Sequence, residues 1–237
     1  REKNRGEHML KNLVAFKNPK SRAAEAFRTL RTNIQFSGLD DSLSSIVVTS
    51  SRPSEGKSTV LINLAITIAQ SGKKVLVIDC DLRRPTVHKK LGLPNAEGLT
   101  NLLIQDKESF DEVVLTTKVP NLSALTSGPT PPNPAELLGT KRMKSIIRQL
   151  TGSFDMVLID APPVIAVTDA QILATIAEGT LIVTSYGATE KFGLVKTKEL
   201  LDKVGAKVLG VVINKVPEKS EHYYYGKYDN SYYKQEK

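Results

Sequence analysis

Ser45–Gln70, SIVVTSSRPSEGKSTVLINLAITIAQ, is the stretch of the chain that decides the fold. Its first six residues contain the apolar run Ile46–Val48 and predict a short buried strand. Ser58–Gln70 has the pattern of a helix that ends before Gly72. Between them, Ser51–Thr59 matches the pattern G-x-x-x-x-G-K-[ST], except that Ser51 replaces the first glycine. A strand, a loop and a helix N-terminus in this order predict a site that binds the phosphates of a nucleotide.

The loop residues have distinct expected roles. Backbone amides of the loop and the positive end of the helix hold the phosphates, Lys57 reaches the β and γ oxygens, and the Ser58 hydroxyl ligates Mg²⁺. Ser51 and Ser54 carry a Cβ where glycine would allow a positive φ, and Pro53 lacks an N–H group, so this loop is stiffer and poorer in donors than a glycine-rich one. Arg52 either restores part of the lost positive potential or points to solvent. The predicted nucleotide-binding residues of the loop are Ser51, Arg52, Pro53, Ser54, Glu55, Gly56, Lys57, Ser58 and Thr59.

Three aspartates follow further apolar strands. Asp79 and Asp81 stand at the end of the predicted strand 74–79, and Asp160 ends the predicted strand 155–160. Open α/β sheets bind ligands at the carboxyl ends of their strands, so these side chains are expected beside Lys57. There they can supply Mg²⁺ ligands and one base. The alternative for any single Asp is that it caps the next turn, but three that converge beside Lys57 favour the metal site.

Apolar strands and helical patterns alternate along the chain, which predicts an α/β fold with a mostly parallel sheet and helices on both faces. We expect residues 1–20 to form an extended basic arm, residues 21–216 to form one domain, and residues 217–237 to form a flexible tail. The other expected helices cover about 21–36, 86–91, 99–104, 109–115, 140–150, 169–177 and 190–204, and one more begins at Asn133. Further strands are expected at 121–126, 180–185 and 207–214.

Composition excludes several classes of protein. The single cysteine, Cys80, excludes a disulfide framework or a multi-cysteine metal site, so a cytosolic location is the default. No apolar run approaches the ~18 residues of a membrane span. The net charge of +8 is concentrated in residues 1–31, where nine Lys or Arg stand against three Glu. This arm is either solvated or contacts an anionic lipid or an acidic partner; nucleic acid is not expected, because no known nucleic-acid-binding motif accompanies the charge.

Tyrosine is concentrated at the end of the chain. The rings are interleaved with charged and small residues, so no apolar face emerges that could pack into a core. A solvated row of phenols beside a nucleotide site suggests that the phenols are its substrate. The candidate phosphorylation sites are six of the seven tyrosines, Tyr223, Tyr224, Tyr225, Tyr228, Tyr232 and Tyr233.

Several motifs together resemble a known family. The phosphate loop, followed by Asp79-x-Asp81-x-Arg83 and Asp160-Ala161-Pro162-Pro163, resembles the P-loop NTPases of the deviant-Walker type, which include the Min/ParA proteins, the nitrogenase iron protein and the bacterial tyrosine kinases. The residues Glu25-x-x-Arg28-x-x-Arg31-x-Asn33, the stretch 127–138 and the tyrosine-rich tail narrow the resemblance to the bacterial tyrosine kinases (BY-kinases). The chain is most similar to the stand-alone cytoplasmic form of Gram-positive capsule and exopolysaccharide systems.

The resemblance implies roles for individual residues. The catalytic residues would be Lys57 on the phosphates, Asp79 as the base toward the tyrosine hydroxyl, and Asp81 in support of the metal site. Ser58, Asp79 and Asp160 would bind Mg²⁺, and Asn214 would contact the adenine of ATP. The helix 21–37, through Glu25, Arg28 and Arg31, would mediate a ring-like homo-oligomer. The alternative for that helix is a local i,i+3 ion pair between Glu25 and Arg28.

The implied activity is an ATP-dependent protein-tyrosine kinase that phosphorylates its own tail in trans and regulates capsular or exopolysaccharide synthesis. Implied partners are a transmembrane activator, whose cytoplasmic tail recruits the kinase to the inner face of the membrane, protein tyrosine substrates and a tyrosine phosphatase. Two alternatives stay open. One is a Min/ParA-like ATPase, although Arg52 stands where those proteins have a signature lysine. The other is a nucleotide-gated scaffold with a tyrosine docking tail.

Overall fold

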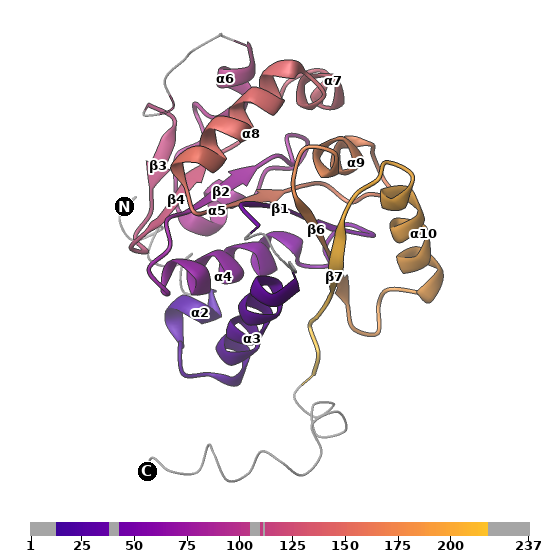
Figure 1. The fold of residues 1–237 in the computed structure, drawn as a ribbon. Helices are drawn as coiled ribbons and strands as arrows, with labels where there is room; N and C mark the ends of the chain where they lie inside the picture. The colour runs from indigo at the N-terminus through magenta and orange to yellow at the C-terminus, as the bar shows by residue number, and fades with distance from the viewer. Residues whose placement is uncertain (1–12, 38–42, 105–109, 111, 218–237) are drawn as a thin grey trace, which may run out of the picture.

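The computed structural model of the protein describes residues 13–37, 43–104, 110 and 112–217. Within these residues the centre is a seven-stranded sheet with the order β3-β4-β2-β5-β1-β6-β7 (Figure 1). Neighbouring strands are parallel except for β3 and β4, so the predicted mostly parallel sheet is confirmed. The strands are β1 (Ser45–Ser50), β2 (Val75–Asp79), β3 (Val114–Thr116), β4 (Leu122–Leu125), β5 (Met156–Asp160), β6 (Gly179–Ser185) and β7 (Val208–Asn214).

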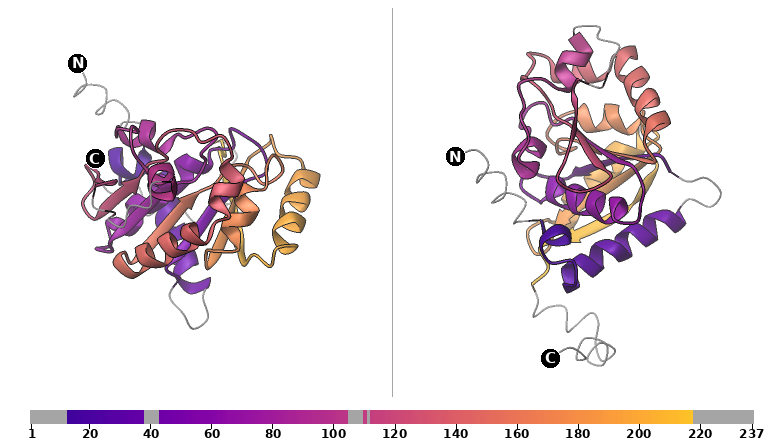
Figure 2. Two further views of the ribbon diagram at one scale, coloured as in Figure 1. Left: turned by 90° about the horizontal axis from the view of Figure 1, so that it is seen from above. Right: turned by 90° about the vertical axis from the view of Figure 1, so that its left-hand side faces the viewer.

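Helices cover both faces of the sheet, as Figure 1 and the two views of Figure 2 show. The helices on one face are α2 (Val14–Lys17), α3 (Arg22–Ser37), α4 (Lys57–Ala69) and α5 (Val87–Leu91). Those on the other are α6 (Leu99–Ile104), α7 (Pro134–Leu138), α8 (Lys141–Ser153), α9 (Asp169–Ala174) and α10 (Lys191–Asp202). Among the described residues, no helix combines the length and the apolar character that a membrane span requires.

The inner strands β1, β2 and β5 each contain an unbroken apolar run because both of their faces are covered. Along β2, Val75 and Val77 pack in the cluster that contains α4, whereas Leu76 and Ile78 pack in the cluster that contains α8. This follows from the two-residue period of a strand. Helix α4 is buried on nearly all sides, because it lies between the sheet and the pair α2 and α3. These two layers hold the loop between β1 and α4 in a fixed place.

Two predictions from the sequence are wrong. The expected helix over 109–115 is not formed by the described residues of that stretch; instead Val114–Thr116 is β3, which pairs antiparallel with β4. Pairing with the next strand in the chain overrides local helix preference here, as is common for β-branched residues. The expected extended arm over 1–20 is wrong for Leu13–Lys17, where α2 packs with Ala15 buried. Asn63 of α4 holds this turn, since its Oδ1 accepts the Ala15 N–H at 2.9 Å. Residues 1–12 lie outside the described part.

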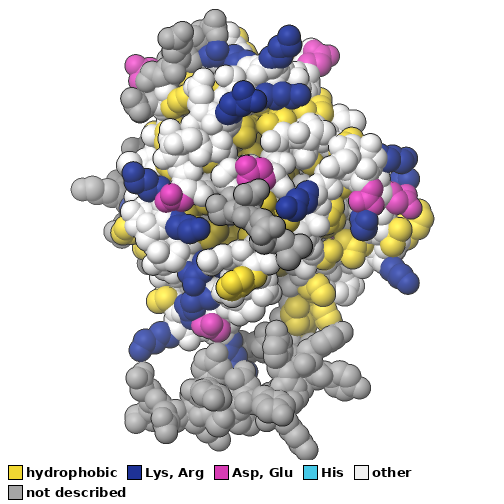
Figure 3. All heavy atoms as spheres, viewed as in Figure 1, with side chains coloured by type: hydrophobic (Ala, Val, Ile, Leu, Met, Phe, Trp, Pro, Cys, Tyr) yellow, Lys and Arg dark blue, Asp and Glu magenta, His cyan; other side chains and the backbone are white. Residues whose placement is uncertain are grey.

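Positive charge is not limited to the N-terminal residues. Lys141, Lys144 and Arg148 project from the exposed side of α8, and Figure 3 shows Lys and Arg side chains gathered over this helix. The opposite side of α8 is apolar and packs on the sheet through Ile146, Ile147 and other residues. The helix is therefore amphipathic, with a basic outer face.

Candidate active site

The phosphate loop has the geometry that its sequence requires. It leaves β1 after Ser50 and enters α4 through Gly56, whose φ of +94° lies in the left-handed region. A Cβ at this position would lie 2.1 Å from the side-chain nitrogen of Asn214, so only glycine fits without displacing that side chain. Ser54 also has a positive φ, 65°. Two residues of this loop thus adopt a conformation that glycine favours.

Glu55 holds the phosphate loop in place through hydrogen bonds, a role that the sequence did not suggest. Its carboxylate is buried, accepts the Arg52 backbone N–H at 2.9 Å, and accepts a short hydrogen bond from the Thr189 hydroxyl. The Glu55 carbonyl accepts the Asn214 amide N–H at 2.9 Å. Asn214, predicted to contact adenine, therefore reaches the loop from the end of β7. Whether it also contacts a base stays a prediction.

Arg52 does not line the cavity that the loop borders. Its side chain is half exposed and lies 3.9 Å from the carboxylate of Glu190, which precedes α10. This position favours the interpretation that Arg52 points to solvent. Lys215 lies at the cavity instead, and its Nζ donates to the Ser54 carbonyl at 2.7 Å.

The three predicted aspartates converge beside Lys57. Strands β2 and β5 are neighbours, and their register places Asp79 opposite Asp160. The Lys57 Nζ lies 2.9 Å from Asp81 Oδ2 and 3.2 Å from Asp160 Oδ1. Lys57, Asp81 and Asp160 form a triad of charged side chains, which are 11%, 7% and 0% exposed in that order. The two ion pairs are therefore largely shielded from contact with water.

Asp79 both caps a turn and offers a free oxygen to a metal, the two roles that the sequence left open. Its Oδ2 accepts the backbone N–H groups of Thr86 at 3.0 Å and of Val87 at 2.9 Å, so it caps the turn into α5. Its Oδ1 is buried and has no hydrogen-bond partner among the described residues, and the same is true of Asp160 Oδ2. Buried carboxylate oxygens without partners are the atoms that a bound cation would satisfy.

These burials change the protonation of the site. Burial raises the pKa of Asp79 to about 8, and the neighbouring charge of Asp160 adds to the effect. Burial also raises the pKa of Asp160, although Lys57 opposes it. Burial alone would lower the pKa of Lys57, but Asp160 and Asp81 outweigh it, so the pKa is raised and the ammonium stays charged. In the free site Lys57 is therefore a cation, and burial favours the neutral form of the Asp79 carboxyl.

The residues fit a Mg²⁺ ion that is bound together with a nucleotide. Among the described residues, no three His, Cys, Asp or Glu side chains lie close enough to hold a metal by themselves. Mg²⁺ in phosphate-binding proteins commonly uses one or two carboxylates, water and phosphate oxygens, so a complete protein cage is not required. The hydroxyl of Ser58, 3.0 Å from the Thr86 hydroxyl, and the unpaired oxygens of Asp79 and Asp160 are the available ligands.

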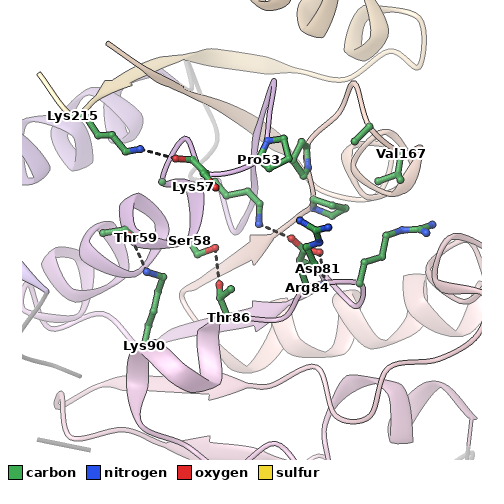
Figure 4. A pocket seen from close by; sticks show the side chains of 16 residues that line it. Pro53, Lys57, Ser58, Thr59, Asp81, Arg84, Thr86, Lys90, Val167 and Lys215 are labelled. Atoms are coloured by element: carbon green, nitrogen blue, oxygen red, sulfur yellow. Dashed lines mark hydrogen bonds and ion pairs between the residues drawn. The ribbon is translucent and has the colours of Figure 1, made fainter. Parts of the chain in front are cut away.

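A cavity of about 620 Å³ opens over the loop and the triad (Figure 4). It contains several cations that sequence reasoning did not assign to the site. Lys90 of α5 donates to the Thr59 hydroxyl at 2.8 Å, and Arg84 follows Asp81 closely in sequence. The pair Arg83-Arg84, which follows Asp81 after Leu82, was the one available signal in the sequence. Lys90 on α5 and Thr86 at its start line the cavity because of how α5 packs, and no sequence motif predicts this position.

The predicted oligomerisation residues lie on α3, remote from the cavity. Glu25 and Arg28 form the local ion pair, with Arg28 Nε 2.7 Å from Glu25 Oε2, and Arg28 also donates to the Pro19 carbonyl at 2.8 Å. The Arg31 guanidinium donates to the Thr67 carbonyl of α4 at 2.7 Å. The local alternative is therefore present, and self-association stays a prediction. The six tail tyrosines lie outside the described residues.

Comparisons with known proteins agree with this fold. A family model described as "AAA domain" matches residues 43–209, more than half of the chain, which defines the chain as a P-loop nucleotide-binding protein. Tyrosine-protein kinase YwqD of Bacillus subtilis (strain 168) is 48% identical over 96% of this chain and 97% of the relative. The putative tyrosine-protein kinase CapB of Staphylococcus aureus is 43% identical over 88% of this chain and 92% of the relative.

The same relationship holds in three dimensions. The crystal structure of the chimerical protein CapA2B2 matches with a TM-score of 0.83 at 41% identity and covers 87% of this chain and 90% of that chain. The chain belongs to the bacterial tyrosine-protein kinases, as the resemblance of its motifs predicted.

Proposed function

We propose that the chain transfers the γ-phosphoryl group of Mg·ATP to tyrosine hydroxyls, beginning with those of its own tail, and so regulates capsular or exopolysaccharide synthesis. The observation that supports this most directly is the placement of Lys57 between Asp81 and Asp160 at the N-terminus of α4. When a nucleotide binds, the Lys57 ammonium can exchange these two carboxylates, which lie at the carboxyl edge of the sheet, for phosphate oxygens.

Each residue of the site has a part in this proposal. The loop amides and the N-terminus of α4 bind the phosphates, and Lys57 neutralises charge on the β- and γ-phosphates. Ser58, Asp79 and Asp160 would hold Mg²⁺, which neutralises phosphate charge when bound. Asn214 contacts the adenine side of the nucleotide. Asp81 keeps Lys57 in place before the nucleotide arrives.

Asp79 is proposed to accept the proton of the tyrosine hydroxyl. A phenol has a pKa near 10, so the proton needs to leave only as the new bond forms. Burial gives Asp79 a raised pKa, which makes its carboxylate a stronger base than an exposed one. Since Oδ2 is occupied by two backbone N–H groups, Oδ1 is the oxygen left both for Mg²⁺ and for this proton, so Asp79 would act as the base only while Ser58 and Asp160 hold the ion.

The experiment that tests the proposal incubates purified chain with Mg·ATP and measures phosphotyrosine by blot and by intact mass. We expect several phosphates per chain, and none on a variant whose six tail tyrosines are phenylalanine. ATP hydrolysis without any phosphotyrosine would contradict the proposal and favour a Min/ParA-like ATPase or a nucleotide-gated scaffold.

We further propose that transfer occurs in trans within a ring-like homo-oligomer, held at the inner face of the membrane by an activator. From Lys215 to Tyr225 is about ten residues, at most ~35 Å when extended, so a neighbouring site is within reach. Neighbours in an oligomer have a high effective concentration. Phosphates on the tails would then repel one another and loosen the assembly.

Mixing two inactive partners tests the trans route. One chain lacks all six tail tyrosines but keeps Lys57, and the other carries Lys57→Met but keeps its tyrosines. We expect neither chain to become labelled alone, and the Lys57→Met chain to become labelled in the mixture. If the mixture stays unlabelled while the unmodified chain phosphorylates itself, transfer occurs in cis.

A further inference from the structure

The cavity over the triad has one end that the nucleotide does not account for. In Figure 4, Lys215 lies on one side of Lys57, whereas Asp81, Arg84 and Val167 lie on the other. In the complex proposed above, phosphates bound at Lys57 and the start of α4 would fill the middle, and the base would extend toward β7. An acceptor must approach the γ-phosphate from the side away from the leaving oxygen. The end beside Arg84 and Val167 is therefore the acceptor side.

The loop between β5 and α9 gives this end an apolar wall. Pro162, Pro163, Ala166 and Val167 line the cavity there. Apolar side chains of this kind suit the face of a phenol ring, whose hydroxyl alone needs a polar environment. This apolar wall fits the ring of a tyrosine, but it does not select among charged residues beside that tyrosine in the substrate.

Arg83 and Arg84 add a second, polar feature at the same end. Arg83 is fixed by two hydrogen bonds to Asp169, Nε to Oδ2 at 2.9 Å and Nη2 to Oδ1 at 3.0 Å. The Asp169 side chain is fully buried, whereas that of Arg83 is 40% exposed at the cavity. A buried carboxylate that orients a half-exposed guanidinium leaves the remaining N–H groups directed by the fold rather than by solvent.

Arg84 is the freer of the two. Its backbone N–H donates to Asp81 Oδ1 at 3.1 Å, which ties the residue to the triad, while its side chain is exposed. Among the described residues, its guanidinium forms no hydrogen bond or ion pair, and it also lines the cavity. Neither arginine has a role in the phosphate and Mg²⁺ sites proposed above.

We propose that Arg84, supported by Arg83, selects tyrosines that are followed by an acidic residue. This rests on the proposed kinase function and specifies its substrate. The tail itself offers both kinds of target, since Asp229 follows Tyr228 and Lys234 follows Tyr233. A carboxylate beside the acceptor would pair with Arg84, and a lysine there would be repelled.

The test measures the initial rate of phosphorylation of Tyr228 in the full chain by mass spectrometry. Asp229→Lys is expected to lower this rate about fivefold to tenfold, and Asp229→Asn by a smaller factor, because a partly exposed ion pair has a moderate effect. In the Arg84→Glu background the order is expected to reverse, with Asp229→Lys faster than Asp229. Arg148→Glu on α8 is the matched control and should leave the order unchanged.

The outcomes separate this proposal from the kinase function on which it rests. Equal rates for Asp229, Asp229→Asn and Asp229→Lys would overturn the selection by charge, even if the tail is phosphorylated. A preference for Asp229 that survives Arg84→Glu would assign the selection to other residues. No phosphotyrosine on any variant, including the parent chain, would instead count against the kinase function itself.

Discussion

Replacing Lys57 with methionine is expected to lower the rate of tyrosine phosphorylation by about a hundredfold to a thousandfold. Removing one preorganised charge from the site of a developing negative charge has effects of this size. Lys57 is the cation of the triad and the residue closest to the phosphates in the proposed complex. Phosphotyrosine formed per minute by equal amounts of parent and variant is the measurement.

The same substitution is expected to destabilise the free protein. Lys57→Met leaves Asp81 and Asp160 buried without their common cation, and breaking a buried ion pair on one side costs about 3–5 kcal/mol. Mg²⁺ with nucleotide should recover part of this loss, because it returns positive charge to the carboxylates. Thermal unfolding of parent and variant without Mg·ADP measures the loss of stability, and the same measurement with Mg·ADP measures how much of it is recovered.

Lys198→Met is the matched control. Lys198 pairs with Asp202 on α10 at 2.5 Å, but the two side chains are 62% and 49% exposed. An exposed pair of this kind contributes about 0–1 kcal/mol, so stability and phosphorylation should both stay near the values of the parent. A Lys57→Met variant that keeps more than a tenth of the parent's rate would contradict the role given to Lys57.

The sequence predicted the centre of this site well because two simple rules apply there. The strand, loop and helix around Ser51–Thr59 are adjacent in sequence, so a local pattern determines them. Asp79 and Asp160 are 81 positions apart, yet parallel strands bring their carboxyl ends to the same edge of the sheet. The prediction needed no knowledge of strand order, only that both strands belong to one parallel sheet.

The parts that the sequence did not predict depend on contacts between separate helices and strands. Val114–Thr116 is a strand only because β4 is beside it. Leu13–Lys17 is ordered by Asn63 and the other residues of α4, more than forty positions later. Arg83 is held by Asp169, which is 86 positions away, and nothing in either local sequence indicates the pair. Such contacts follow from tertiary packing, which periodicity does not encode.

Replacing Asp79 with asparagine is expected to lower the rate of phosphorylation by about a hundredfold or more, because loss of a general base has effects of 10² to 10⁴. The variant keeps a carbonyl oxygen that can accept the N–H groups of Thr86 and Val87, so the turn into α5 should remain. The loss is then assigned to the missing carboxylate rather than to local unfolding. Initial rates of labelling at saturating Mg·ATP are the measurement.

Asp79→Asn is expected to raise the free energy of unfolding of the metal-free chain, although it lowers the rate of phosphorylation. In the metal-free folded chain the pKa of Asp79 is about 8, against 3.8 for an ordinary Asp. Between these values the folded state keeps a proton that the unfolded chain has released, so the free energy of unfolding falls as the pH rises and levels off above about pH 8. Asp79→Asn removes the cost of ionising this buried carboxyl. Without Mg²⁺ the variant should therefore be only slightly more stable than the parent at pH 5. At pH 9 the difference should be on the order of several kcal/mol.

Mg·ADP should reverse the order of the two proteins. The parent gains stability when Mg²⁺ binds the Asp79 carboxylate, and the variant, with a neutral ligand, gains less. Melting temperatures at pH 9 should therefore cross: the variant is higher without Mg·ADP and the parent is higher with it. A variant that is less stable than the parent at pH 9 without metal would show that the buried charge of Asp79 is already compensated in the free protein. Such a crossing would mean that Asp79 is kept for its ligand and its substrate, at the expense of the stability of the free protein.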